Sequence, residues 1–208
     1  TNLELSAFYL DVLKDLLYTA GKKSKARLSS LTVLDEMLSG ITRLMAPILV
    51  FTAEDVWQFY RPESPSVHLE LFPDPEDYPD FEAVEKDFEA IIALREDALK
   101  ALEQARNSKL IKASLEACIE LEIKDPALLS VLKKYEAELP VYFIVSEVKL
   151  NLSSGGIELE TEKAKISVKA AQGSKCPRCW KYKTDMGSHP DHPEVCGFCA
   201  AALDELEA

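Results

Sequence analysis

Four cysteines near the end of the chain constrain its fold more than any other feature. They form two Cys-x2-Cys pairs, Cys176 with Cys179 and Cys196 with Cys199, and sixteen residues separate the pairs. Two residues between thiols let both sulfurs of a pair bind one ion, and two pairs supply a tetrahedral four-cysteine zinc site. Because thiolates take all four positions, no position stays open for a reactive water. The spacing therefore predicts one structural zinc ion, with iron in the same cage as the lesser alternative.

The segment that carries these cysteines is poor in large apolar residues. It offers mainly the following six: Trp180, Tyr182, Met186, Val195, Phe198 and Leu203. Packing alone therefore falls short, and we expect bound metal and a neighbouring part of the chain to supply the missing stability. His189 and His192 lie between the pairs. We expect them to be surface loop residues, because four thiols already saturate the ion.

Cysteine usage and hydropathy indicate the cellular compartment in which the protein works. The chain has five cysteines, and only Cys118 stands outside the two pairs. Clustered Cys-x2-Cys pairs are typical of metal binding in a reducing compartment, which predicts a cytoplasmic protein. Cys118 follows the pattern of a buried, inert thiol. No apolar run approaches the ~18 residues of a membrane span, and the start at Thr1, already in helical rhythm, suggests a fragment or a processed chain.

Charge is distributed unevenly along the chain. The formal net charge is −12, which argues against a nucleic acid partner for the whole surface. From Lys163 to Lys183, however, there are seven basic residues and no acidic one. This basic run is either a solvated surface or a local contact for a polyanion.

The residues around the cysteines allow two interpretations. Five of them offer cations and stacking faces to an unpaired base or a phosphate backbone: Arg178, Trp180, Lys181, Lys183 and Phe198. Alternatively, Lys175, Arg178 and Lys181 neutralise the negative charge of a zinc ion held by four thiolates, and Trp180 belongs to the core.

Hydrophobic periodicity predicts a mainly helical α+β chain. Helices are expected over residues 3–20, 30–45, 81–106 and 127–137, with a further short helix that starts near Ala53. Thr52 and Asp55 resemble a capping box for that short helix, and Asp125-Pro126 is a start signal for the fourth. Alternating residues predict extended segments over 66–71, 115–123 and 141–152, two short strands within 157–168, and a turn at 153–156.

Five prolines between residues 62 and 79 mark a domain boundary. We therefore expect a helical bundle over residues 1–79, a small α+β domain over 80–172 and a zinc-binding tail over 173–208.

Six stretches resemble the C-terminal part of bacterial isoleucyl-tRNA synthetase, a class I aminoacyl-tRNA synthetase. They are FYLDVLKDLLYT (8–19), LMAPILVFTAEDVWQF (44–59), SVHLELFP (66–73), ALEQARNSKLIKASLEA (101–117), FIVSEV (143–148) and GSKCPRCWKY (173–182). Together they span nearly the whole chain. The Ser-Leu-Glu-Ala and Lys-Cys-x-Arg-Cys-Trp stretches are the most specific. One departure is Lys112, where the family has a glycine that allows positive φ.

The resemblance implies an anticodon-binding domain, a junction domain and a zinc-binding tail near the anticodon loop. It implies isoleucine-specific tRNA as the partner and no membrane, and we expect a monomer. ATP would bind only the catalytic domain, whose His-Ile-Gly-His and Lys-Met-Ser-Lys-Ser motifs are absent here. The fragment would bind and position tRNA and catalyse nothing, so no catalytic residue is assigned.

Two other function classes compete with this interpretation. A zinc-ribbon adaptor that binds another protein would show no preference for one tRNA. A free-standing enzyme with catalytic zinc is disfavoured by the closed four-thiol cage.

Overall fold

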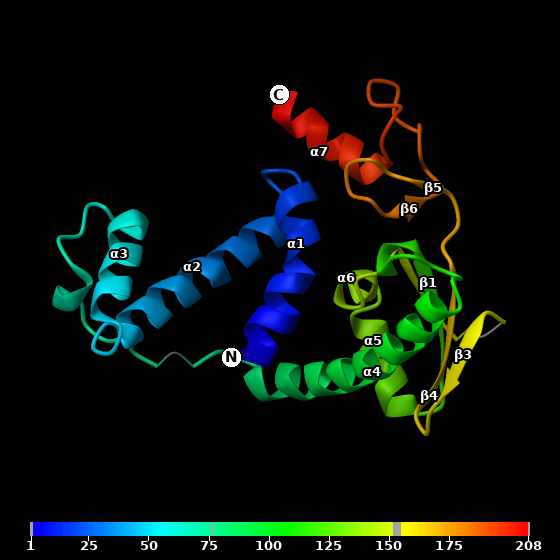
Figure 1. The fold of residues 1–208 in the computed structure, drawn as a ribbon, viewed down its shortest axis with the longest axis horizontal. Helices are drawn as coiled ribbons and strands as arrows, with labels where there is room; N and C mark the ends of the chain where they lie inside the picture. Colours follow the sequence, from blue (N-terminus) through cyan, green and yellow to red (C-terminus); the bar gives the residue numbers. More distant parts are fainter. Residues whose placement is uncertain (1, 76, 152–154, 208) are drawn as a thin grey trace. The chain divides into compact units, whose positions relative to one another are not determined.

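The computed structural model describes residues 2–75, 77–151 and 155–207 (Figure 1). Its contacts divide the chain into two compact units. Unit 1 is Thr1–Lys22 with Asp80–Ala208, and unit 2 is Lys23–Pro79. The predicted mainly helical α+β class is confirmed in the described residues. This division groups the first helix with the residues from Asp80 onward. The three-domain scheme of residues 1–79, 80–172 and 173–208 stays a prediction.

Unit 2 is helical. Its elements are α2 (Lys25–Met45), α3 (Val50–Tyr60) and a 3-10 turn (Val67–Leu69). The helix α2 starts five residues before the predicted Ser30 because the Ser24 hydroxyl accepts a hydrogen bond from the Arg27 N–H. The extended segment expected over 66–71 is wrong, since the 3-10 turn occupies its centre.

The capping box expected at Thr52 is also wrong. The helix α3 already starts at Val50, and no side chain caps its N-terminus. The acid between the two expected box residues has another use. The Glu54 carboxylate accepts hydrogen bonds from the Ser66 hydroxyl at 2.8 Å and from the Val67 N–H at 3.1 Å. These bonds hold the 3-10 turn against α3.

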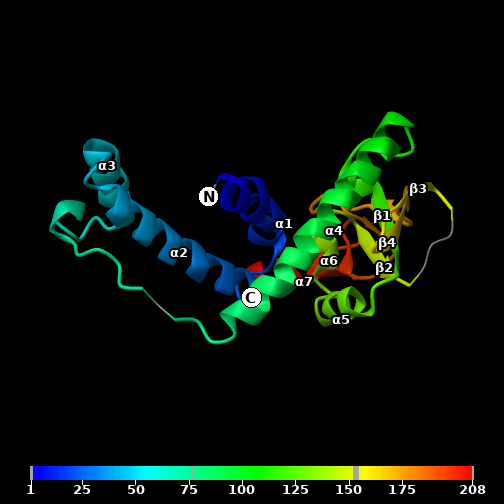
Figure 2. The same ribbon diagram turned by 90° about the horizontal axis from the view of Figure 1, so that it is seen from below.

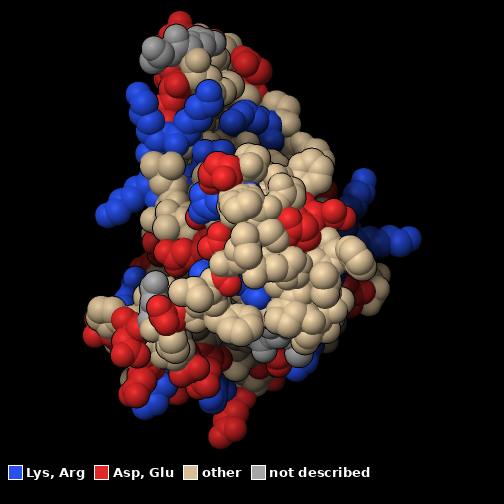
Figure 3. Space-filling view, turned by 90° about the vertical axis from the view of Figure 1, so that its left-hand side faces the viewer, with Lys and Arg blue, Asp and Glu red and all other residues tan. Residues whose placement is uncertain are grey.

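Unit 2 has a small core and a large uncharged surface. Its buried apolar cluster is Ala46, Ala53, Trp57 and Val67. By contrast, several large apolar side chains are exposed, among them Ile48, Phe51, Phe59, Leu69 and Leu71. Uncharged side chains also fill the middle of the face shown in Figure 3. Exposed apolar surface of this extent is typical of a region that contacts a further protein surface.

Unit 1 combines helices with a mixed sheet. Its helices up to residue 142 are a π-helical segment (Asn2–Tyr9), α1 (Leu10–Thr19), α4 (Phe81–Asn107), a 3-10 turn (Ser114–Glu116), α5 (Pro126–Lys134) and α6 (Leu139–Tyr142). Its strands up to residue 170 are β1 (Ala117–Ile123), β2 (Glu147–Leu150), β3 (Ile157–Glu160) and β4 (Ala164–Ala170). The strand order is β2-β1-β4-β3, with β1 and β2 parallel and the other pairs antiparallel.

The core of unit 1 lies between α4, α5 and the sheet (Figure 2). The register pairs Ile119 with Val168 and Leu121 with Ile166 across β1 and β4, and all four side chains are fully buried. The helix α4 contributes residues spaced three or four apart, which is the period of one helical face. They are Ile91, Leu94, Ala98, Ala101, Leu102 and Ala105.

Several local predictions for unit 1 are confirmed. The long helix runs over Phe81–Asn107, and the pair of strands around Glu162-Lys163 is present as β3 and β4. The helix α5 begins at Pro126, and the Asp125 carboxylate accepts from the Ala127 N–H at 2.9 Å. Such a cap is a purely local signal, which is why the sequence predicts it well.

Other predictions for unit 1 are wrong in detail. An extended segment was expected over 141–152, but its first two residues form the end of the short helix α6, which has Pro140 in its first turn, where no N–H is needed. Lys112 does not have a positive φ, whereas the nearby Lys109 has φ +62°. The Lys112 N–H instead donates to the Glu116 carboxylate at 2.8 Å. The expected turn at 153–156 lies partly outside the described residues.

The cysteine segment begins at a glycine that no other residue could replace without strain. Gly173 has φ +91°, and a Cβ there would lie 2.2 Å from the Lys183 carbonyl oxygen. The chain then forms the short strands β5 (Ser174–Lys175) and β6 (Tyr182–Lys183) and ends in α7 (Gly197–Glu207). The turn between β5 and β6, residues 176–181, is called the knuckle below.

The knuckle packs on the C-terminal end of α1. The Arg178 guanidinium donates to the backbone carbonyl of Thr19, and the Lys181 ammonium pairs with the Asp15 carboxylate. The last carbonyls of a helix lack intrahelical donors and attract cations. From α7, the Glu205 carboxylate lies so near Gly21 that a side chain at Gly21 would meet it. Thr19 and Gly21 are consequently buried.

We expect the Lys181–Asp15 pair to stabilise this packing. Lys181→Ala should lower the free energy of unfolding by about 1–3 kcal/mol, because the Asp15 side chain is only 27% exposed and loses a charged partner. Urea unfolding in zinc-containing buffer measures the change. Lys14→Ala is the matched control, since Lys14 and its partner Asp11 are solvent-exposed.

A double variant tests whether the two side chains interact. Lys181→Ala combined with Asp15→Asn should cost less than the sum of the two single changes. Strict additivity would contradict the ion pair.

Candidate metal centre and nucleic-acid interface

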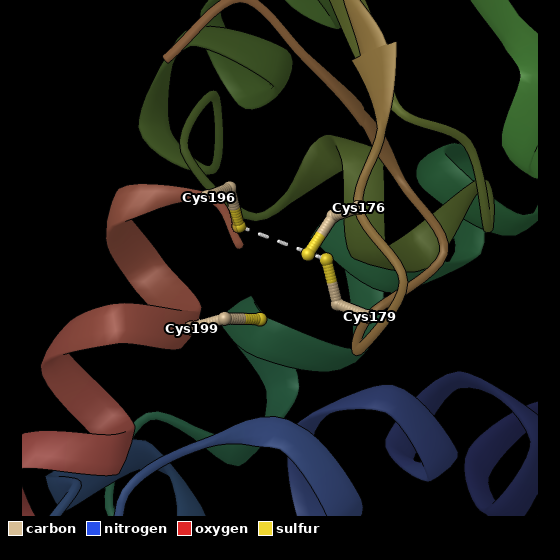
Figure 4. A group of neighbouring side chains, drawn as sticks. All are labelled: Cys176, Cys179, Cys196 and Cys199. Carbon is tan, nitrogen blue, oxygen red and sulfur yellow. Dashed lines mark hydrogen bonds between the residues drawn. The ribbon is translucent and has the colours of Figure 1, made fainter. Parts of the chain in front are cut away.

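The four clustered thiols come together from two parts of the cysteine segment (Figure 4). All four residues are buried, and their sulfurs lie within 4.8 Å of one another. The Sγ atoms of Cys179 and Cys196 are 3.8 Å apart. A tetrahedral ion with metal–sulfur bonds of ~2.3 Å places its ligands about 3.8 Å apart. The arrangement therefore fits one zinc ion with four sulfur ligands.

Backbone hydrogen bonds shape both halves of the cage. In the knuckle, the Cys176 N–H donates to the Lys181 carbonyl at 2.9 Å, and the Trp180 N–H donates to the Cys176 carbonyl at 2.8 Å. In the second half, Cys196 immediately precedes α7 and Cys199 lies in its first turn. The Asp185 carboxylate accepts from the Gly197 N–H at 3.1 Å and holds that helix start in place.

The thiols differ in their readiness to ionise. Burial opposes ionisation of Cys176, but backbone N–H groups of Cys179, Cys196 and Arg178 point at its sulfur and bring its pKa down to about 6. Burial raises the pKa of Cys199 to about 11, against the effect of a hydrogen bond from the Arg178 side chain. Cys176 thus ionises more readily than Cys199, and a metal ion must displace the proton from the Cys199 thiol.

The fifth cysteine stands apart from this cage. Cys118 is 4% exposed on β1, and burial raises the pKa of its thiol to about 12. The prediction of a buried thiol is confirmed, and its inertness stays a prediction that the raised pKa supports. Within the described ranges, the four-cysteine group is the only cluster of three or more potential metal ligands.

Two predicted contact residues carry exposed aromatic rings beside the cage. Trp180 is 61% exposed and Phe198 is 52% exposed, although each directly neighbours a cysteine of the cage. The core interpretation of Trp180 therefore does not hold. The Lys175 ammonium lies 5.4 Å from the Trp180 ring centroid, within the range of a cation–π contact.

The predicted cationic residues have a different environment. Arg178 and Lys181 have partners on α1, and Arg178 also approaches the Cys199 sulfur, so both sit between the cage and α1. Lys183 is half-buried in β6, where it pairs with Ser174 of β5. The structure thus supports the charge-neutralising interpretation for Arg178.

The rest of the basic run is partly neutralised by acids from elsewhere in the chain. Lys165 pairs with Glu158 at 3.0 Å, and Lys169 pairs with Glu120 at 2.8 Å. Glu120 is only 8% exposed in its side chain, so its charge requires this partner. The run is therefore less basic at the surface than its sequence indicates.

Sequence reasoning missed the groups that complete this region. Asp15 and Thr19 carry no signal in the sequence, because their partners are about 160 residues away along the chain. Tyr18 of α1 is 82% exposed. The sequence indicates this exposure only by placing Tyr18 off the apolar stripe of the helix.

The loop histidines are less exposed than expected. His189 Nε2 lies 3.2 Å from Asp204 Oδ2, and His192 Nε2 lies 3.4 Å from Asp204 Oδ1. The two rings stack with centroids 5.7 Å apart. They tie the loop to α7 and take no part in the four-sulfur group.

A membrane span is not found: over residues 2–75, 77–151 and 155–207, every helix is too short or too polar to cross a bilayer.

Comparison with known proteins gives two family matches. Residues 1–123 match the anticodon-binding domain of tRNA ligases, and residues 173–202 match a zinc finger found in FPG and IleRS. The second match covers all four clustered cysteines, and together with their geometry it assigns one structural zinc ion to the chain.

Similar curated proteins share one description. Isoleucine–tRNA ligase from Syntrophotalea carbinolica is 43% identical over 98% of the chain, the protein of that name from Geobacter sulfurreducens is 44% identical over 97%, and that from Thermotoga maritima is 41% identical over 96%. The chain spans only 22% of the length of each of these relatives. Because the anticodon-binding match covers more than half of its residues, the chain belongs to the family of anticodon-binding domains of tRNA ligases.

Proposed function

We propose that the chain is the C-terminal, tRNA-binding part of an isoleucine–tRNA ligase and that it recognises the anticodon region of isoleucine tRNA. The observation that carries the proposal is the alignment of nearly the whole chain with proteins named isoleucine–tRNA ligase. Activation of isoleucine with ATP and its transfer to tRNA would belong to the remainder of a longer protein. Such a protein would act as a monomer in the cytoplasm.

The zinc ion has a structural role in this proposal. Cys176, Cys179, Cys196 and Cys199 are its four ligands, which leaves no coordination position for a substrate or a water. The ion holds the knuckle and the start of α7 together. A residue beside a ligand is fixed by the cage, so its side chain is presented with little further loss of conformational entropy.

The exposed rings are the RNA-reading groups. Trp180 and Phe198 offer flat apolar faces on which unpaired bases of an anticodon loop can stack. Lys183 supplies a cation for phosphate oxygens. Arg178 and Lys181 act mainly as positioning residues, because their charged groups already hold the knuckle on α1.

The first experiment concerns the metal. The purified chain should contain one zinc ion, and Cys179→Ser should lose it and unfold the cysteine segment while the helices persist, because three sulfurs no longer saturate the ion. Metal analysis and circular dichroism measure both effects. Cys118→Ala is the matched control and should keep the zinc. Nitrogen or oxygen in the first shell by X-ray absorption would overturn the four-sulfur assignment.

A second experiment concerns catalysis. The chain should show no isoleucine-dependent exchange of pyrophosphate into ATP, since both nucleotide-binding motifs are absent from its sequence. Exchange activity that stays with the chain through repeated purification would contradict the proposed division of labour.

A third experiment tests RNA recognition. Trp180→Ala should weaken binding of isoleucine tRNA by about 1–3 kcal/mol, the usual effect of losing one stacked base. Binding is measured at fixed salt against a tRNA with an altered anticodon, and zinc content is checked in each variant. Leu206→Ala removes an apolar side chain that is 49% exposed on α7, outside residues 1–123, and serves as the control.

The same titration separates the two candidate functions. Lys183→Ala should weaken binding of all RNAs about equally and reduce the salt dependence by roughly one phosphate contact. Equal affinity for both tRNAs, unchanged by Trp180→Ala in zinc-loaded protein, would favour a protein-binding adaptor.

A further inference from the structure

The helix α2 of unit 2 carries a row of apolar side chains that is largely uncovered. Its members recur at alternating spacings of three and four: Leu31, Leu34, Leu38, Ile41 and Met45. This row is called the α2 seam below, and at 1.5 Å per residue it is about 21 Å long. Leu31, Leu38 and Ile41 are exposed, and Leu34 and Met45 are half-buried. A row with this spacing is normally the buried side of a helix.

The packing within unit 2 uses a different side of α2. The helix α3 lies beside the C-terminal end of α2 in both ribbon views (Figure 1 and Figure 2). There Ala46 packs in the small core with Ala53 and Trp57 of α3. Ala46 follows the seam residue Met45 by one position, so it lies about 100° further around the helix axis. Packing of α3 therefore leaves the α2 seam accessible.

A second row beside the seam contains a glycine that the described chain does not explain. Its members follow one another at spacings of four, three and four, so they share one side of the helix: Val33, Met37, Gly40 and Leu44. Over the part of the chain that the structure describes, a Cβ at Gly40 would meet no atom within 4 Å outside its own helix backbone. Glycine inside a helix is unfavourable relative to alanine, and the close approach of a further backbone is one reason to keep it.

The two rows define the shape of the partner that fits them. Alternating spacings of three and four are the pattern by which helices pack side by side. The second row widens the apolar stripe beyond the seam of a two-stranded coiled coil, which is typical of a helix inside a bundle. The matching partner is therefore a helical surface of roughly four turns, with one backbone close to Gly40.

The absence of charge from both rows indicates what kind of contact this is. The charged residues of α2 stand elsewhere on the helix: Lys25, Arg27, Asp35, Glu36 and Arg43. An RNA backbone requires cations, which neither row offers, so RNA is disfavoured as the occupant. Surfaces rich in aliphatic side chains are typical of permanent contacts rather than of transient ones.

We propose that α2 is a docking site for apolar helices in the remainder of a longer protein, which pack along the α2 seam and approach Gly40 with their backbone. The proposal rests on the proposed function, which makes the chain the C-terminal part of such a protein. Its curated relatives provide the occupant, because the chain spans only 22% of their length and most of each relative therefore has no counterpart in it.

The first experiment compares the zinc-loaded chain with the longer protein made from the same gene. Leu38→Cys, at the centre of the seam, should react with a maleimide about 10-fold or more slowly in the longer protein, because a covered thiol reacts only when the contact opens. Thr32→Cys is the matched control, since Thr32 is exposed on α2 but belongs to neither row. It should react at similar rates in both proteins. Mass spectrometry of the labelled peptide separates these thiols from the native cysteines.

A second experiment uses the glycine. Gly40→Ala should raise the unfolding temperature of the chain, where its new methyl group meets open space and alanine favours the helix. The same change should lower the unfolding temperature of the longer protein, where the methyl group meets the docked backbone. Thr32→Ala is the control and should shift both proteins in the same direction.

The remaining outcomes identify other occupants. Equal labelling of Leu38→Cys in the two proteins would overturn the docking site, as would a Gly40→Ala change that stabilises both. Protection of Leu38→Cys in the chain that grows with its concentration would assign the seam to a second copy. Protection by added anticodon stem-loop would assign it to RNA. Either result would overturn the proposal.

The two proposals fail in different ways. A longer protein that charges tRNA with isoleucine but leaves Leu38→Cys reactive would retain the proposed function and remove the docking site. A longer protein that protects Leu38→Cys but shows no isoleucine-dependent activity would do the reverse. If the gene encoded no longer protein, both proposals would fall.

Discussion

The bond between one zinc ion and four sulfurs is the interaction on which the C-terminal part of the chain depends. The buried cluster there consists of the four cysteines with only Val195 and Ala200. The metal thus takes the place of the branched apolar side chains that form a core elsewhere. One consequence concerns the aromatic residues. Since the cage and not the rings stabilises the fold, Trp180 and Phe198 can stay exposed without loss of stability.

The knuckle connects the zinc cage to α1, which is distant in the sequence. Arg178 lies between two ligands and Lys181 lies two residues after one, and both reach the end of α1. Three residues separate the end of α1 from Lys23, where unit 2 begins. A rigid cage therefore fixes the last turn of the helix from which the second unit continues. Packing of this kind explains why α1 belongs to unit 1, although the linear order of motifs suggests otherwise.

Much of the fold was predictable where the signal is local. The cysteine spacing, the helical repeat of apolar residues along α4 and the Asp125-Pro126 start of α5 can each be read directly from one continuous stretch of sequence. The structure contains all three. The sequence failed where tertiary contacts decide. The segment expected to be extended over 141–152 begins with the last residues of α6, and the partners of Arg178 and Lys181 lie far away in the chain. Periodicity does not encode such partners.

The charge distribution bears on how a strongly acidic chain would bind RNA with selectivity, as the proposed function requires. Of the seven basic residues from Lys163 to Lys183, Lys165, Lys169 and Lys181 are paired with carboxylates, so few cations are left for phosphates. Phosphate contacts give affinity without sequence information, whereas contacts to bases give selectivity. In the proposed function, a surface with exposed rings and with cations that are partly engaged would favour base contacts over phosphate contacts. In the proposed function, the acidic remainder of the chain would disfavour RNA held in other orientations, because like charges repel.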